Sequence, residues 1–228
     1  MPLRATLMAI PYTALNGERW FMEAEFLPAE RRGEELAIIC HPHPLFGGEM
    51  HNNVVDGLFR GLSSEYATVR FNFSGVGGSD GAHEKGDGEV GQVKAVVDHM
   101  CGEFVREKSC GAWNKVHVIG YSFGAAMALP AALASEQVSS CTSISFPFEM
   151  FSKHAVESAA LQAKKKAPLL FLTGDADDFT PIKTFKQWVA KFPGSVQCII
   201  QGADHFFGGH ERRLVDESRK FLMGSTNT

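Results

Sequence analysis

Short apolar segments alternate with longer segments of helical periodicity along almost the whole chain, and this alternation limits the possible folds more than any other feature. Segments rich in β-branched and aromatic residues are predicted to be strands buried on both faces, at 36–40, 68–73, 116–120, 141–146, 169–173 and 196–200. Helices are predicted at 54–63, 89–106, 123–135, 181–191 and 211–222. Such alternation is typical of an α/β fold with a mostly parallel sheet.

The N-terminal part of the chain has a different pattern. Residues 19–27 alternate between apolar and polar side chains, as expected for a strand with one exposed face. Asn16-Gly17 precedes this segment, and that dipeptide is a strong signal for a hairpin turn. We therefore expect an antiparallel edge, formed by pairing with residues 5–10.

Length and composition limit the classes of protein. A chain of 228 residues, 44% of them hydrophobic, is predicted to form one domain over residues 1–228, with a polar tail at about 223–228. The formal net charge of -4 argues against a nucleic-acid partner. No apolar run approaches the roughly 18 residues of a membrane span. An oligomeric state does not follow from these features.

Cysteine content bears on the cellular compartment. The chain has 5 cysteines, an odd number, and begins without a charged segment followed by a long apolar run. These features favour free thiols in a reducing compartment, so a cytoplasmic location is expected.

A strand, a tight turn and a helix are predicted around the sequence G-Y-S-F-G at residues 120–124. A serine at such a turn takes a strained backbone conformation, and the flanking glycines remove Cβ atoms that would clash between strand and helix. This context favours Ser122 as a nucleophile over a simple helix cap. The backbone N–H of Phe123 would lie at the helix start, where it can stabilise an oxyanion.

Acidic residues and then a histidine follow two later strands. The segment 169–173 is followed by G-D-A-D-D-F-T-P, and the segment 196–200 by Q-G-A-D-H-F-F-G. The carboxyl ends of parallel strands share one rim of a sheet, so an acid and His205 are expected near Ser122. A nucleophilic serine needs such a base, and the base needs a carboxylate to orient it.

With serine, acid and histidine in this order, each after a predicted strand, the chain resembles proteins of the α/β-hydrolase fold. Among them it is most similar to the small, nearly capless dienelactone hydrolases and serine esterases. The resemblance extends from residue 40 to the helix after His205. It implies a mostly parallel central sheet, an antiparallel N-terminal edge and helices on both faces. The stretch 147–167 is too short for the helical cap domain that many relatives insert, which implies a minimal cap or none.

The resemblance also assigns a catalytic triad. Ser122 matches the nucleophile, and His205 matches the base because it follows Gly202 with the family's Gly-x-x-His spacing. Asp177 is the favoured acid, since residues 174–181 fit the family's G-x-x-D-x-x-[VT]-P pattern.

Three other aspartates lie close to these residues in the sequence. Asp175 and Asp178 are alternative acids, although Asp175 is expected to brace its turn and Asp178 to cap the following helix. Asp204 is adjacent to His205 and is interpreted as a residue that braces the loop.

The histidines of C-H-P-H-P-L-F-G-G, residues 40–48, have two interpretations. As metal ligands they lack a further ligand at a typical spacing. By resemblance, the stretch stands where relatives carry H-G-x-P, His41 matches the strand-end histidine, and the backbone N–H of His43 completes the oxyanion hole. Pro42 and Pro44 have no N–H, so the donor is His43 or, failing that, Leu45.

The glycine-rich loop at residues 70–81 superficially resembles a dinucleotide-binding fingerprint. Its sixth position is Asp80 rather than glycine, and no helix follows at once. It is more similar to the family's R-G-x-G-x-S-x-G loop, with Ser74 in place of a frequent arginine, and we interpret it as structural.

Phenylalanines near the predicted rim could form an apolar acyl site, although each could equally belong to the core. The residues favoured for substrate binding are Phe46, Phe148 and Phe206; Phe123, Phe179 and Phe207, with Met150 and Phe151, are further candidates. The lysines at 164–166 are expected on a solvated helix face.

The resemblance implies a serine hydrolase that cleaves an ester or thioester of a small or medium, apolar acyl group, without a cofactor or metal. The expected partner is a small-molecule acyl substrate, which would form an acyl-enzyme intermediate. Acyltransferase or peptidase activity with the same triad remains an alternative, as does a catalytically silent binding protein.

Overall fold

The computed structural model describes residues 3–31, 34–108, 111–148 and 167–224. Within them, eight strands form one sheet in the order β1-β2-β4-β3-β5-β6-β7-β8. The strands are β1 Thr6–Thr13, β2 Arg19–Leu27, β3 Glu35–Cys40, β4 Ala67–Phe71, β5 Lys115–Tyr121, β6 Ser140–Ile144, β7 Leu169–Gly174 and β8 Val196–Ile200. The strands from β4 to β8 pair in parallel, which confirms the predicted α/β fold.

The N-terminal hairpin forms an antiparallel edge, as predicted. β1 and β2 pair from Thr6 opposite Phe26 to Thr13 opposite Arg19. Gly17 in the turn has a φ of 86°, a conformation that glycine adopts without steric cost. β2 then pairs antiparallel with β4, which joins the hairpin to the parallel strands.

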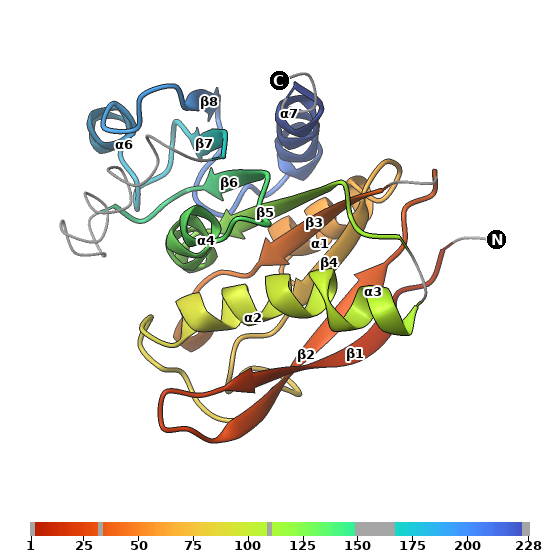
Figure 1. Ribbon diagram of the computed structural model, residues 1–228. Helices are drawn as coiled ribbons and strands as arrows, with labels where there is room; N and C mark the ends of the chain where they lie inside the picture. Colours follow the sequence, from red (N-terminus) through yellow and green to blue (C-terminus); the bar gives the residue numbers. More distant parts are fainter. Residues whose placement is uncertain (1–2, 32–33, 109–110, 149–166, 225–228) are drawn as a thin grey trace.

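Helices cover both faces of the sheet (Figure 1). Side chains of α2, α4 and α6 pack in one hydrophobic core, and those of α1 and α7 pack in a second core on the opposite face. The helices are α1 Asn53–Gly61, α2 Glu89–Cys101, α3 Glu103–Glu107, α4 Phe123–Ala134, α6 Ile182–Val189 and α7 Glu211–Gly224, with a 3-10 turn, η1, at Pro44–Phe46.

The central strand β3 illustrates how a continuous apolar run produces two cores. Leu36, Ile38 and Cys40 lie in the core under α2 and α4, whereas Ala37 and Ile39 lie in the core under α1 and α7. Successive side chains of a strand point to opposite faces, so a strand covered on both faces must be apolar throughout.

Three predicted elements differ from the structure. β8 is not buried on both faces, because it is the last strand of the sheet, and Val196 is 50% exposed. The helix expected at 89–106 is divided into α2 and α3 at Gly102, whose φ of -110° and ψ of -83° are not helical. α7 continues to Gly224, so the tail begins later than predicted.

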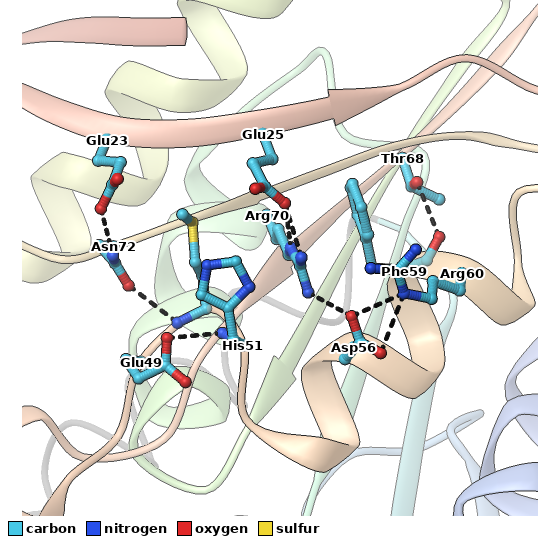
Figure 2. A network of polar contacts seen from close by, with 11 residues as sticks. Glu23, Glu25, Glu49, His51, Asp56, Phe59, Arg60, Thr68, Arg70 and Asn72 are labelled. Carbon is cyan, nitrogen blue, oxygen red and sulfur yellow. Dashed lines mark hydrogen bonds and ion pairs between the residues drawn. The ribbon is translucent and has the colours of Figure 1, made fainter. Parts of the chain in front are cut away.

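A charged network joins the hairpin to the parallel part of the sheet (Figure 2). Arg70 on β4 donates hydrogen bonds of 2.8 and 2.6 Å to Glu25 on β2, and one of 2.7 Å to Asp56 on α1. Its guanidinium also lies 4.3 Å from the ring centre of Phe59. A fully buried cation needs such partners, because an unpaired charge in the core would be strongly destabilising.

The predictions on free thiols and on membrane spans can be compared with the described residues. In the described ranges the free thiols are those of Cys40, Cys101, Cys141 and Cys198, as expected. Cys110, Met150, Phe151 and the lysines at 164–166 lie outside the described residues. None of the described helices is both long and apolar enough to cross a bilayer.

Candidate active site

Ser122 lies in the turn between β5 and α4 with a φ of 54° and a ψ of -119°. A left-handed backbone is strained for any residue except glycine, and here it is fixed by close packing on both sides. A Cβ at Gly120 would lie 2.3 Å from the Gly124 carbonyl oxygen, and one at Gly124 would lie 2.5 Å from the Cys40 carbonyl oxygen. The predicted turn, its strain and its need for glycines are therefore present.

Two hydrogen bonds connect Ser122, His205 and Asp177 in one line. The Ser122 Oγ lies 3.0 Å from Nε2 of His205, and Nδ1 of His205 lies 3.0 Å from both carboxylate oxygens of Asp177. Because the carboxylate can only accept, Nδ1 carries the proton and Nε2 is free to accept from the serine. Residues from the ends of β5, β7 and β8 thus meet at one rim of the sheet.

The carboxyl of Asp177 is held in its charged form. Burial favours the neutral acid, but the hydrogen bond from His205 and that from the Thr180 backbone N–H outweigh burial and lower the pKa of Asp177 below its ordinary value. The backbone N–H groups of Phe179 and Thr180 donate to Oδ1 at 2.9 and 3.0 Å. These donors also fix the orientation of the carboxylate toward the imidazole.

The three neighbouring aspartates have other contacts. Asp175 accepts a 2.6 Å hydrogen bond from the Gly202 N–H, so it links its turn to the loop after β8 rather than bracing its own turn as expected. Asp204 accepts from the N–H groups of Phe206 and Phe207 and braces the histidine loop. The prediction that Asp178 caps the next helix is wrong, because α6 begins only at Ile182, and Pro181 at its N-cap makes no side-chain capping bond.

His41 joins two loops at the rim through both of its ring nitrogens. Nδ1 donates to the Pro42 carbonyl at 2.6 Å, and Nε2 accepts from the Phe73 backbone N–H at 3.0 Å. Burial lowers the pKa of His41 to about 4, so its ring is neutral near pH 7. These bonds use both nitrogens, and in the described ranges no three His, Cys, Asp or Glu side chains are grouped to hold a metal.

The loop after β3 offers one of its two candidate oxyanion donors. The backbone N–H of Leu45 donates to Nδ1 of His43 at 3.2 Å and is therefore occupied. The backbone N–H of His43 makes no hydrogen bond to a described residue. His43 is the residue before the η1 turn and has a φ of -60°. Farther along, the Met50 N–H donates to Oδ1 of Asn72 at 2.8 Å, which fixes the loop.

A known protein family and solved structures are similar to this chain over most of its length. A family model described as an alpha/beta hydrolase domain matches residues 40–223. The chain belongs to the alpha/beta hydrolase family. Its solved relatives include a protein of unknown function from Agrobacterium tumefaciens, which is 27% identical with a TM-score of 0.78. The match covers 96% of this chain and 97% of that one.

Two more alpha/beta hydrolase structures are similar over almost their whole length. An alpha-beta serine hydrolase homologue from Coxiella burnetii is 29% identical, with a TM-score of 0.76, over 96% of this chain and 97% of the other. A Xanthomonas campestris protein described as a serine hydrolase without lid is 26% identical, with a TM-score of 0.76, over 96% and 94%. The Xanthomonas description agrees with the nearly capless architecture expected from the sequence.

A cavity of about 420 Å³ opens beside Ser122 in this alpha/beta hydrolase. Phe46 and Phe206 line it, in agreement with their expected positions, and Phe123 and Phe179 line it as well. The full lining is Pro42, His43, Phe46, Gly47, Gly48, Asn52, Tyr121, Ser122, Phe123, Pro147, Phe179, His205 and Phe206.

The prediction for Phe148 is wrong. Its side chain is 2% exposed, is absent from the cavity lining, and stacks on Trp188 with ring centres 5.9 Å apart. Phe207 is also fully buried and packs in the core under α1 and α7. An apolar ring after a strand fits either a rim or a core, and only packing distinguishes the two.

The sequence reasoning missed Tyr121 and Asn52. Tyr121 lines the cavity, and its hydroxyl donates a 2.7 Å hydrogen bond to the His205 carbonyl. Asn52 lines the same cavity from the N-cap of α1. In the sequence, Tyr121 is marked only by its place before Ser122, and Asn52 only as a capping residue before a predicted helix. Neither feature identifies a residue of a cavity wall.

The glycine-rich loop at 70–81 has structural contacts. Glu23 on β2 accepts from the side-chain amide of Asn72 and from the Gly78 backbone N–H, both at 2.8 Å (Figure 2 shows the Asn72 contact). No residue of this loop belongs to the cavity lining, although all of it lies in the described ranges. These contacts hold Asn72 to β2, and through the bond from Met50 they also hold the loop after β3.

Proposed function

We propose that this alpha/beta hydrolase is a serine hydrolase that cleaves an ester, or less readily a thioester, of a small or medium apolar acyl group. The observation that carries the proposal is the line of hydrogen bonds from Ser122 through His205 to Asp177 on the wall of an apolar cavity. The serine hydrolase descriptions of the Coxiella and Xanthomonas relatives support the same reaction class.

In the first half-reaction, the Ser122 oxygen attacks the acyl carbonyl carbon while His205 Nε2 takes the hydroxyl proton. Asp177 stabilises the imidazolium that forms, because its carboxylate is charged and lies 3.0 Å from Nδ1. His205 then returns the proton to the leaving alcohol or thiol as the bond to the acyl carbon breaks. The product of this step is an acyl ester of Ser122.

Two backbone N–H groups are suited to bind the oxyanion. Phe123 is the first residue of α4, where the helix dipole favours negative charge, and His43 lies on the facing loop. Donors aimed at a developing charge stabilise the transition state more than the ground state. In the second half-reaction, His205 takes a proton from water as the water attacks the acyl carbon; it then returns the proton to the Ser122 oxygen as that bond breaks and the carboxylic acid leaves.

The cavity wall favours an apolar acyl group. Phe46, Phe179 and Phe206 are 80%, 53% and 59% exposed around its mouth. A substrate that covered these rings would remove apolar surface from water, at roughly 25 cal/mol for each Å². Their exposure therefore supports a substrate with substantial apolar area.

Active-site labelling tests the proposal. A fluorophosphonate probe should label the wild-type protein covalently, and labelling should be lost in Ser122→Ala and strongly slowed in His205→Ala. The Ser74→Ala variant is a matched control, because Ser74 is buried in another loop. A folded wild-type protein that resists the probe would rule out a serine hydrolase.

Substrate assays test the finer statements. p-Nitrophenyl esters and thioesters of graded chain length would give the preferred acyl group from kcat/KM. Acyl release should proceed in water alone; a complete requirement for an added alcohol or thiol would instead identify an acyltransferase.

A further inference from the structure

The cavity wall contains few polar side chains besides Ser122 and His205. Among its described lining residues they are His43, Asn52 and Tyr121. The Tyr121 hydroxyl donates its proton to the His205 carbonyl at 2.7 Å. Its proton is therefore unavailable to a substrate, which leaves His43 and Asn52, both in the segment between β3 and α1.

The ring of His43 is fixed as a hydrogen-bond donor. Nδ1 accepts from the Leu45 backbone N–H at 3.2 Å, so a neutral ring carries its proton on Nε2. Partial burial and the nearby His83 lower the pKa of His43, which keeps the ring neutral near pH 7. No described residue accepts a hydrogen bond from Nε2.

The ring is also held in position by aromatic neighbours. Its centre lies 4.9 Å from that of Phe46, in an edge-on arrangement, and 4.8 Å from that of Phe123, in a tilted one. Aromatic pairs at this spacing are favourable. The donor therefore belongs to an ordered wall rather than to a freely rotating side chain.

Asn52 repeats the same arrangement. Its Oδ1 accepts from the Val54 backbone N–H at 3.0 Å, because Asn52 is the N-cap of α1. This bond fixes the amide so that its NH₂ group is the free end, and no described residue accepts from that group. In both side chains the acceptor atom is occupied by the loop backbone and only a donor remains.

We propose that His43 Nε2–H and the Asn52 amide NH₂ form a donor-only subsite, which selects esters bearing a hydrogen-bond acceptor oxygen on an otherwise apolar chain. The inference rests on the proposed function, because it concerns the same cavity. Both side chains are partly exposed, so in the free enzyme their donors are open to water, and a substrate oxygen would offer an acceptor in its place. A purely alkyl chain removes that water without replacing it, which has a cost in binding free energy.

Pairs of esters of equal length test the subsite. On the acyl side, p-nitrophenyl 5-methoxypentanoate is compared with p-nitrophenyl heptanoate. On the alcohol side, 2-methoxyethyl hexanoate is compared with butyl hexanoate. The readout is the ratio of kcat/KM for the ether ester to that for the alkyl ester, which cancels effects common to both substrates.

Two variants remove the donors separately. Asn52→Asp keeps an oxygen that can cap α1 and replaces the NH₂ donor with an acceptor. His43→Phe keeps an aromatic ring between its neighbours and removes the ring nitrogens. Each should lower the ether-to-alkyl ratio about three- to tenfold, in whichever arm places the oxygen at the subsite. Circular dichroism and thermal unfolding establish that each variant is folded.

The neighbouring His51 supplies a matched control, because it is exposed on the same loop and does not line the cavity. His51→Gln should leave the ratio unchanged. The inference is overturned if the ratio changes less than about twofold in both variants and both arms, or if His51→Gln lowers it equally. Fluorophosphonate labelling of wild type separates this failure from failure of the proposed function.

Discussion

The Tyr121 hydroxyl donates a 2.7 Å hydrogen bond to the backbone carbonyl of His205. The residue before the proposed nucleophile thus holds the loop that carries the proposed base. Tyr121 is 2% exposed, and burial, followed by the charges of Asp177 and Asp204, raises the pKa of its hydroxyl above the ordinary value. The hydroxyl therefore remains a proton donor throughout the neutral pH range.

Tyr121→Phe should leave the His205 carbonyl without its buried partner. We expect the free energy of unfolding to fall by about 1–3 kcal/mol, because an unpaired buried carbonyl is costly. Movement of the His205 loop should also slow fluorophosphonate labelling at least severalfold and lower kcat more than it changes KM.

Tyr12→Phe is the control for this variant. The Tyr12 hydroxyl donates to Oε2 of Glu84 at 3.1 Å or to the Gly88 carbonyl at 3.2 Å and does not line the cavity, so its loss should affect stability without slowing labelling. Equal labelling rates for wild type and a folded Tyr121→Phe protein would contradict a positioning role for Tyr121.

Asp177→Asn should abolish most turnover while leaving the protein folded. An amide in place of the carboxylate favours the wrong imidazole tautomer and cannot stabilise the imidazolium, so kcat should fall by roughly 10⁴-fold. Asp178→Asn provides the comparison, since Asp178 is exposed one residue away. Ester hydrolysis rates of the two variants discriminate between the candidate acids; a larger loss in Asp178→Asn would refute the assignment.

The backbone donor at residue 43 can be removed selectively. His43 has a φ of -60°, a value that proline adopts, so His43→Pro removes the N–H with little change in φ. We expect kcat to fall by about 10²–10³-fold in His43→Pro. His43→Ala keeps the N–H and should lose far less activity on an alkyl ester. Similar losses in both variants would assign the catalytic effect to the imidazole instead.

The buried ring of His41 should make stability depend on pH. Its pKa is lowered from 6.5 to about 4 in the folded protein, so the unfolded chain binds more protons between these values. The contribution to stability is complete above about pH 6.5 and decreases by about 3 kcal/mol as the pH falls toward 4.

His41→Gln removes the titrating group and isolates this contribution from that of other acids and bases. Denaturant unfolding at pH 7 and pH 4 should show a smaller loss of stability in the variant than in wild type. Parallel pH profiles for the two proteins would contradict the neutral, buried state of His41.

Much of the fold was predictable because hydrophobic periodicity and turn residues depend on the conformation of short segments. β2 and β8 have the predicted bounds, and the other strands differ by a few residues at their ends. The hairpin signal at Asn16-Gly17 and the glycines around Ser122 also led to correct predictions, since each reflects a steric requirement of one short segment.

The predictions that failed depended on the position of an element in the fold. The segment that became β8 is as apolar as an interior strand, yet it lies at the edge of the sheet. Phe148 follows a strand as a cavity residue could, yet it stacks on Trp188 in the core. The position of a strand in the sheet and the packing partner of a ring both depend on distant segments, so the local sequence does not reveal them.

The sequence by itself determined the chemical types and their order: a strained serine, a later acid and a later histidine, each after a buried strand. Tertiary structure decided which groups meet. It brought Asp177 rather than Asp178 to His205, and it placed Asn52 and Tyr121 on the cavity wall. The physical reason is range: backbone strain and periodicity act within a few residues, whereas hydrogen-bond partners and cavities form between segments far apart in the chain.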